Sequence, residues 1–283
     1  MARIKPSAIC ETLTQPQKLR SYGKMICVAD FGANRIALVD LNGDVQDEIG
    51  LGTLHEPTGV AFIGKEILTV DWPRRLHHFD LGGTVIRSTT IPGATQPQAV
   101  SHIPTTQENV ITEFQDDKLI CLDDQLSLIH SQGTGVTSVS SPGPDDFHEP
   151  KDILYAEDQQ VGPSVFVADS ANNRVLRICV HNVDYLAKMT LDWNNTKEFK
   201  GTSNFRPVGV AYHQKDEVLF CVDGAGGDIW EIDVRSGAIN RIFNNPGTAP
   251  GQLSNPVGID VVADDYLAVS DWNTNRVTIF EIQ

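Results

Sequence analysis

The chain has 283 residues and a mass of 31.0 kDa, and its 37 acidic and 22 basic side chains give a formal net charge of −15. Hydrophobic residues make up 40% of the sequence and charged residues 21%, which excludes disordered, collagenous and coiled-coil chains. The acidic balance also argues against a chain-wide phosphate-binding surface, because nucleic-acid affinity rests largely on cationic contacts.

The sequence shows neither a membrane-spanning segment nor a signal peptide. No stretch approaches the length of apolar sequence that spans a bilayer, and the opening residues lack the apolar core of a signal peptide. The cysteines lie in apolar runs without a C-x-x-C pair, which favours reduced core residues in a cytoplasmic protein. They are Cys10, Cys27, Cys121, Cys179 and Cys221.

One sequence unit recurs six times and predicts the fold. Each copy has a proline, an apolar pair, a β-like run that ends in an acid, and a further run that usually opens with a base. The copies open near residues 16, 57, 97, 150, 207 and 256. A unit of about 47 residues with turn residues every 8 to 12 positions accommodates four short antiparallel strands, which is one propeller blade. The chain is therefore predicted to be all-β, as a single six-bladed β-propeller domain over residues 1–283.

The two ends of the chain are predicted to meet in the last blade. Residues 1–13 precede the first repeat, and the sixth repeat stops after three strands. An N-terminal strand from 1–13 would supply the missing fourth strand and leave the ring without an open edge.

The motif that links the second and third strands carries a family resemblance. It reads VADFGANRI, VADSANNRV and VSDWNTNRV in the clearest copies. This pattern resembles the NHL repeat over essentially residues 15–283, and the whole is similar to the C-terminal propeller of tripartite-motif (TRIM) NHL proteins. The resemblance implies a domain that recruits partners or substrates for a ubiquitin ligase. Some propellers of that family bind RNA.

The repeated acid and base are expected to build the scaffold: the acid should accept turn N–H groups, and the base should form ion pairs. The innermost strands alternate between an apolar set that packs between blades and a small or polar set that faces the channel. Asp260 is expected to pair there with Lys18 or Arg20. The channel register has too few carboxylates and imidazoles to converge on one point, and no hydrolase motif is present. We therefore expect no enzyme activity, no metal and no cofactor.

The residue after the repeated acid varies between blades. It is aromatic in four neighbouring blades of the ring, as Phe31, Trp72, Phe114 and Trp272. These rings are candidate anchors for a protein partner, since aromatic residues are enriched at interfaces; the alternative is that they pack between blades. Phe147, in the acidic loop 140–149, is a further candidate anchor.

The sequence thus favours a non-catalytic protein-interaction platform, expected to be monomeric and not membrane-bound. The alternative is an RNA-binding regulator that uses the same face. The loops of that face are net acidic, which disfavours it. Its candidate contacts are Lys18, Arg20, Arg74, Lys200 and Arg206. A propeller lyase or lactonase is the third possibility.

Overall fold

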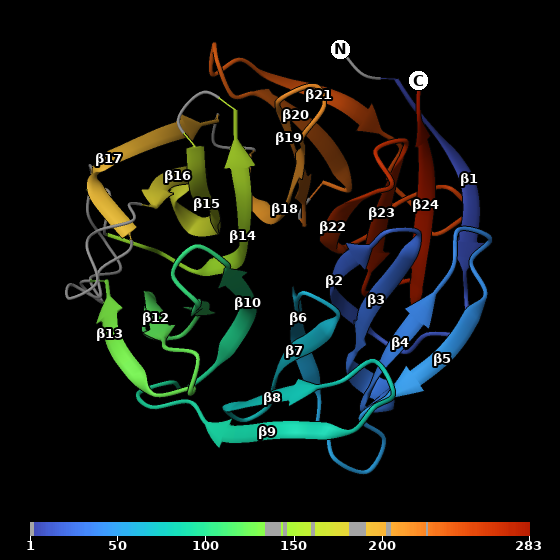
Figure 1. Cartoon of the computed structure of the whole chain (residues 1–283). Helices are drawn as coiled ribbons and strands as arrows, with labels where there is room; N and C mark the ends of the chain where they lie inside the picture. Colours follow the sequence, from blue (N-terminus) through green and yellow to red (C-terminus); the bar gives the residue numbers. More distant parts are fainter. Residues whose placement is uncertain are drawn as a thin grey trace.

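The computed structural model is a ring of six four-stranded antiparallel sheets around a central axis (Figure 1). This architecture confirms the predicted all-β, six-bladed propeller. The structure describes residues 3–133, 143, 146–159, 162–180, 191–201, 205–224 and 226–283, with backbone only at 191–195.

The first three blades follow the sequence without a crossover. Blade 1 contains β2 (Pro16–Tyr22), β3 (Met25–Asp30), the 3-10 turn η1 (Phe31–Ala33), β4 (Arg35–Val39) and β5 (Val45–Ile49). Blade 2 contains β6 (Pro57–Ile63), β7 (Glu66–Asp71), β8 (Arg75–Phe79) and β9 (Val85–Thr90). Blade 3 contains β10 (Pro97–Ile103), β11 (Glu108–Glu113), β12 (Lys118–Leu122) and β13 (Leu128–Gln132).

The last three blades repeat this plan. Blade 4 contains β14 (Pro150–Asp158), β15 (Gly162–Asp169), the 3-10 turn η2 (Ser170–Asn172), β16 (Arg174–Val180) and β17 (Leu191–Lys200). Blade 5 contains β18 (Pro207–His213), β19 (Val218–Asp223), β20 (Asp228–Asp233) and β21 (Ile239–Asn244). Blade 6 contains β22 (Pro256–Val262), β23 (Tyr266–Asp271) and β24 (Arg276–Ile282). Each repeat proline is thus the first residue of an innermost strand.

An N-terminal strand completes the sixth blade, as the sequence predicted. β1 (Ile4–Cys10) pairs antiparallel with β24, giving the sheet order β1-β24-β23-β22. The register runs from Ile4 opposite Ile282 to Cys10 opposite Val277. The Ser7 hydroxyl also donates to the carbonyl of Ile279 at 3.1 Å. Both ends of the chain are therefore held in one sheet (Figure 1).

The core lies between adjacent blades. The apolar set of the innermost strands is at most 1% exposed; its members are Leu19, Val60, Val100, Ile153, Val210 and Ile259. Small residues alternate with this set because neighbouring innermost strands approach closely. A Cβ atom at Gly59 would lie 2.7 Å from the Cα atom of Ala99 in the next blade. A larger side chain there would force the two blades apart.

The repeated acid anchors the loop that enters its own blade. The backbone N–H of Thr14 donates to Asp30 at 2.6 Å, that of His55 to Asp71 at 3.0 Å, and that of His148 to Asp169 at 2.7 Å. Glu113, Asp223 and Asp271 accept equivalent bonds in the other three blades. These buried carboxylates satisfy backbone donors that the turns would otherwise leave unpaired, which supports the scaffold interpretation of the acid.

The repeated base is less uniform than the sequence suggests. Arg35 and Arg174 pair with the acids of their own blades at 2.8 and 2.6 Å. In blade 2, however, Arg75 is exposed, and the buried imidazole of His77 lies 3.1 Å from Asp71. Arg276 in blade 6 donates instead to loop carbonyls, including that of Ala249 at 2.7 Å. Among the described residues, the ion pair between the repeated acid and the repeated base therefore forms in blades 1 and 4, and other contacts replace it in blades 2 and 6.

The residues that follow the repeated proline and acid, and that differ between blades, lie at one end of the ring. The six prolines, the six acids and the loops between blades all lie at this end, which we call the proline face. The turns between first and second strands lie at the opposite face, where β2 ends at Tyr22. The residues that follow each proline and each acid consequently surround the mouth of the channel on the proline face.

Candidate functional site

The channel is crossed by a buried ion pair. Arg20 of blade 1 donates to Asp152 of blade 4 at 2.7 Å and to the carbonyl of Ile153 at 2.9 Å. Asp152 also accepts the N–H of Val210 at 3.0 Å. The prediction that Asp260 pairs with Lys18 or Arg20 was wrong: Asp260 accepts the Ser21 N–H at 2.6 Å, and the partner of Arg20 is Asp152.

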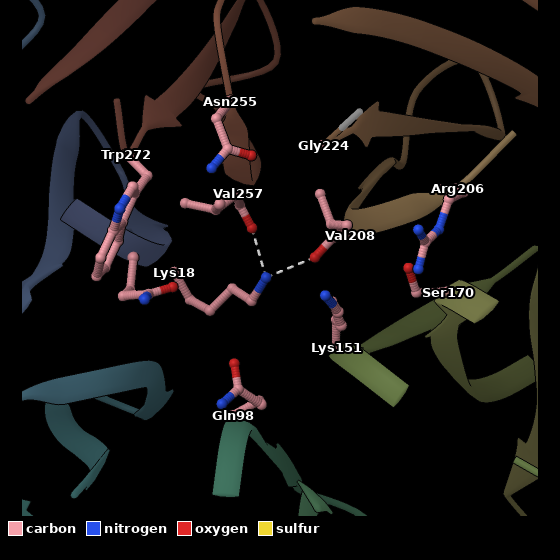
Figure 2. Close-up of a pocket in the computed structure, with 11 residues that line it drawn as sticks. Lys18, Gln98, Lys151, Ser170, Arg206, Val208, Gly224, Asn255, Val257 and Trp272 are labelled. Carbon is pink, nitrogen blue, oxygen red and sulfur yellow. Dashed lines mark hydrogen bonds between the residues drawn. The ribbon is translucent and has the colours of Figure 1, made fainter. Parts of the chain in front are cut away.

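A cavity of about 380 Å³ opens at the mouth of the channel on the proline face (Figure 2). Most of its lining residues directly follow a repeat proline or a repeat acid. The lining comprises Gln17, Lys18, Gln98, Lys151, Ser170, Arg206, Val208, Gly224, Asn255, Val257 and Trp272. Every charged side chain in this set is basic. The cavity is therefore a local positive site in an acidic protein.

Lys18 projects into the middle of this cavity (Figure 2). It follows its proline by two positions, where Gly59, Gly209 and Gly258 stand in other blades. Its ammonium donates to the carbonyls of Val208 and Val257, and the residue is only 3% exposed. Burial lowers the pKa of Lys18 to about 8, with Asp152 acting in the opposite direction. Lys18 is therefore still mainly protonated at neutral pH.

Two further cations stand at the rim. The Lys151 ammonium lies 3.6 Å from Glu149 and 5.0 Å from the centre of the Phe114 ring. Burial lowers the pKa of Lys151, which is half-buried. Arg206 is more exposed and lies 3.2 Å from the same Glu149 carboxylate. Glu149 thus bridges two of the three cations from outside the cavity lining.

The lining also includes a buried serine, Ser170. Ser170 takes the position after the acid that is aromatic in four other blades, and it is fully buried. Ser170 lines the cavity, and its buried hydroxyl has no hydrogen-bond partner among the described residues. A buried hydroxyl without a partner is unfavourable, so a hydrogen bond from this group to a ligand would stabilise it.

The four predicted aromatic anchors all reach the surface of the proline face. Trp72 is 37% exposed, and Phe31, Phe114 and Trp272 are partly buried. Phe31 and Trp272 meet edge to face with ring centroids 5.1 Å apart across the junction of blades 1 and 6. None of the four rings is enclosed between blades. We call these four residues the aromatic arc.

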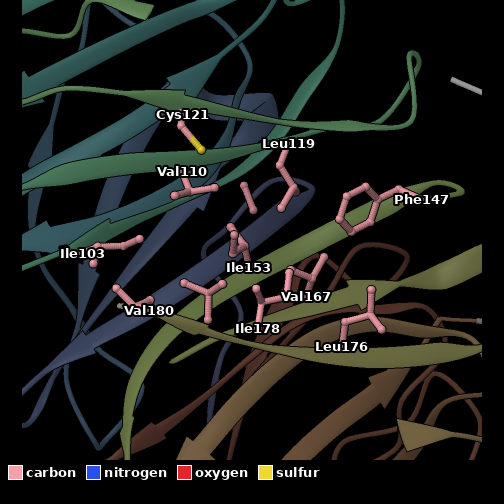
Figure 3. Packing of buried hydrophobic residues seen from close by; sticks show 12 residues of the cluster. Ile103, Val110, Leu119, Cys121, Phe147, Ile153, Val167, Leu176, Ile178 and Val180 are labelled. Carbon is pink, nitrogen blue, oxygen red and sulfur yellow. The ribbon is translucent and has the colours of Figure 1, made fainter. Parts of the chain in front are cut away.

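Phe147 is not a surface anchor, and that prediction was wrong about its position. The side chain is 0% exposed and packs with Leu119, Val167 and Leu176 in the core between blades 3 and 4 (Figure 3). A phenyl ring in an acidic loop gains more by filling the space between blades than by meeting water. Of the predicted acidic loop, residues 140–142, 144 and 145 lie outside the described residues.

The predicted RNA contacts do not form one surface. Lys18 and Arg206 line the cavity, whereas Arg20 is sealed in the channel by Asp152. Lys200 is exposed and lies 3.8 Å from Glu198, and Arg74 is exposed on the turn before β8. Lys151 and Ser170 also line the cavity but were not predicted as site residues. Their positions in the repeat could have identified them. Lys151 follows the proline of blade 4 and Ser170 follows its acid, as Gln17 and Phe31 do in blade 1.

The opposite face has a different polar arrangement. His213 is 2% exposed, lies 3.1 Å from Asp216 through Nδ1, and contacts the carbonyl of Asp264 at 2.9 Å through Nε2.

Among the described residues, no three His, Cys, Asp or Glu side chains group in a way that would hold a metal ion. Within the same part of the chain, no helix has the length and apolar character needed to cross a bilayer.

Comparison with known proteins identifies the fold. No family model and no curated protein matches the chain. Among solved structures, the β-propeller domain of Cps50 (Swd1) from Myceliophteria thermophila aligns with a TM-score of 0.67 at 12% identity, covering 99% of this chain and 100% of that one. A streptogramin B lyase gives 0.65 at 14% identity and coverage of 100% and 98%. Virginiamycin B lyase from Staphylococcus aureus gives 0.61 at 15% identity and coverage of 99% and 99%.

The chain is a six-bladed β-propeller. At 12 to 15% identity these likenesses show the fold alone, because one fold hosts many unrelated functions. The NHL repeat and the TRIM relationship stay predictions from the sequence motif.

Proposed function

We propose that this propeller is a non-catalytic protein-interaction platform and that its proline face binds the partner. The observation that carries the proposal is the aromatic arc. Four large rings occupy one repeat position in four consecutive blades, and all four reach the surface of the same face. Partly exposed aromatic side chains on a rigid frame are typical anchors of protein interfaces.

The surroundings of the arc fit this role. Each loop behind it is held by a buried acid, so the rings sit on backbone that is already ordered before binding. A preorganised surface loses little conformational freedom when a partner docks. By the NHL resemblance, the partner is a substrate recruited for a ubiquitin ligase of the TRIM type in the cytoplasm.

The test compares a double variant of the aromatic arc with a control variant that loses one exposed ring from the opposite face. Trp72→Ser with Trp272→Ser removes two rings of the arc, and Tyr22→Ser removes an aromatic ring of similar exposure, 39% against 37% for Trp72, from the opposite face. The wild-type chain and both variants are used as bait in cell extract, with and without nuclease, and bound proteins are quantified. Each lost interface anchor is worth about 2 kcal/mol, so capture by the double variant should fall by more than tenfold.

The outcomes separate the functions. Loss of nuclease-resistant partners in the Trp variant, with capture intact in the Tyr22 variant, supports the proposal. Equal capture by the wild type and a folded Trp variant overturns it. Partners that disappear from the wild-type bait on nuclease treatment instead identify the RNA-binding alternative.

A further inference from the structure

The cavity at the channel mouth combines three cations with no carboxylate in its lining. Lys18, Lys151 and Arg206 come from three different blades and converge on one space of about 380 Å³. Buried charges in proteins are normally paired with an opposite charge. Lys18 is 3% exposed, yet within the described residues no carboxylate lies at ion-pair distance from its ammonium, which is held by two backbone carbonyls. An ammonium has three N–H donors, so one donor stays free.

Ser170 provides a second and independent indication of a ligand. Ser170 lines the same cavity, and its fully buried hydroxyl finds no acceptor or donor in the described part of the chain. An anion that accepts from the Ser170 hydroxyl and from the free N–H of Lys18 would satisfy both groups. A neutral or cationic ligand would bring no negative charge to the ammonium, whose nearest opposite charge, Asp152, is not at ion-pair distance among the described residues.

Without a ligand, the two rim cations pair with Glu149. Its carboxylate lies 3.6 Å from Lys151 and 3.2 Å from Arg206, and it is about one-third exposed. Both cations therefore already bind a carboxylate at the edge of the cavity. An incoming anion would compete with Glu149 for them, which makes Glu149 a built-in competitor.

We propose that the cavity binds one anionic side chain of a peptide segment in the partner protein. The recognised chemistry is a carboxylate or a phosphorylated hydroxyl, held by Lys18, Lys151, Arg206 and the Ser170 hydroxyl. This inference rests on the proposed function: the aromatic arc would supply apolar contacts to the same segment, since Trp272 belongs to both the arc and the cavity lining.

The distribution of charge favours a peptide over RNA. An RNA strand needs a track of cations along its backbone. Here the convergent positive charge is confined to one cavity, because Arg20 is neutralised by Asp152 and Lys200 lies beside Glu198. A single acidic or phosphorylated side chain matches a positive site of this extent.

The experiment uses purified chain and defined probes at constant ionic strength. The probes are a short peptide with a central phosphoserine, the same peptide with glutamate or with serine at that position, inorganic phosphate, and an oligouridylate of about ten nucleotides. Dissociation constants are measured by calorimetry for the wild type, Lys18→Met, Lys151→Met, Glu149→Gln and Lys215→Met. Lys215 is an exposed lysine of the opposite face and gives a matched loss of one positive charge.

We expect the wild type to bind the phosphoserine or the glutamate peptide and to ignore the serine peptide. Lys18→Met and Lys151→Met should each weaken binding by about tenfold or more, because each removes a charge-assisted hydrogen bond. Glu149→Gln should strengthen binding by removing the competitor, and Lys215→Met should leave it unchanged. Circular dichroism confirms folding, and if Lys18→Met fails to fold, Lys151→Met and Glu149→Gln decide the result.

Three results would overturn the inference: equal affinity for all three peptides, equal weakening by Lys215→Met, or tighter binding of the oligouridylate than of either anionic peptide. Binding of inorganic phosphate without either anionic peptide would show an adventitious ion only and would also overturn it. Failure of the proposed function can be distinguished from failure of this inference. In that case the Trp72→Ser and Trp272→Ser double variant would keep partner capture, whatever the anion titrations show.

Discussion

Arg20 and Asp152 come from blades on opposite sides of the ring, and their side chains meet inside the channel at 2.7 Å. Asp152 is fully buried and Arg20 is 6% exposed. The second Asp152 oxygen accepts the N–H of Val210 from blade 5. This pair therefore ties three blades together at the axis, just beneath the cavity that Lys18 lines.

Breaking this pair should destabilise the protein strongly. Arg20→Leu leaves the Asp152 carboxylate buried without its cation, and we expect a loss of about 3 to 5 kcal/mol in the free energy of unfolding. Arg20→Leu with Asp152→Asn removes both charges and should recover part of that loss. Urea unfolding of the two variants measures the difference. Equal stability of the single and double variants would show that the unpaired charge of Asp152 is not the cause of the loss.

Removing residues 1–13 should open the ring. β1 supplies the fourth strand of blade 6, and its loss uncovers the edge of β24 and the core residues that Cys10 and Leu13 cover. We expect a steep fall in the melting temperature and self-association through the free edge. Thermal unfolding and gel filtration test this. A truncated chain that stays monomeric with an unchanged melting temperature contradicts the closure.

Phe147→Ala should lower the stability of the protein and leave partner capture by the proline face unchanged. The ring is 0% exposed between blades 3 and 4, so truncation leaves a cavity and should cost about 3 to 5 kcal/mol. The partner surface should be unchanged at temperatures where the variant is folded. Denaturant unfolding and capture from extract measure the two effects. A stable variant with lost capture would instead place Phe147 in the interface.

Anion binding should weaken as pH rises through about 8. Burial lowers the pKa of Lys18 to about 8, so the side chain is mainly charged at pH 7 and mainly neutral at pH 9. Asp152 faces this ammonium as an opposite charge, and Lys151 and Arg20 face it as like charges. We expect affinity for the glutamate peptide to fall by about tenfold between these two pH values. Calorimetry across the range tests this, and a constant affinity would remove Lys18 from the site.

Lys18 should also make stability pH-dependent in a defined window. Because its folded-state pKa is about 8 against an ordinary value of 10.5, the folded chain binds fewer protons than the unfolded chain between these values. The contribution of this group to stability therefore rises with pH through that window and is constant below it. Comparing urea unfolding of the wild type with Lys18→Met at pH 7, 9 and 10 isolates this contribution, and identical pH profiles would contradict it.

The sequence by itself determined the ring. Proline at the start of each innermost strand, an acid at the end of the second strand and turn residues between them recur in every blade, and each reflects a local requirement. Asn34 is an example. It adopts the left-handed φ of 56° that asparagine tolerates, and its side chain accepts the N–H of Glu56 at 2.7 Å at the entry to the next blade. Such local interactions recur in the sequence and are readable from it.

The tertiary structure alone decided which of the variable residues share a site. Lys18, Lys151 and Arg206 are far apart in sequence, and only the closed ring brings them to one cavity. Arg20 is two residues from Lys18, yet it turns into the channel because Asp152 offers a buried charge there. Phe147 and Trp72 both looked like surface anchors, and packing between blades enclosed the first and left the second exposed. Burial and pairing across blades depend on residues distant in sequence, so local pattern does not encode them.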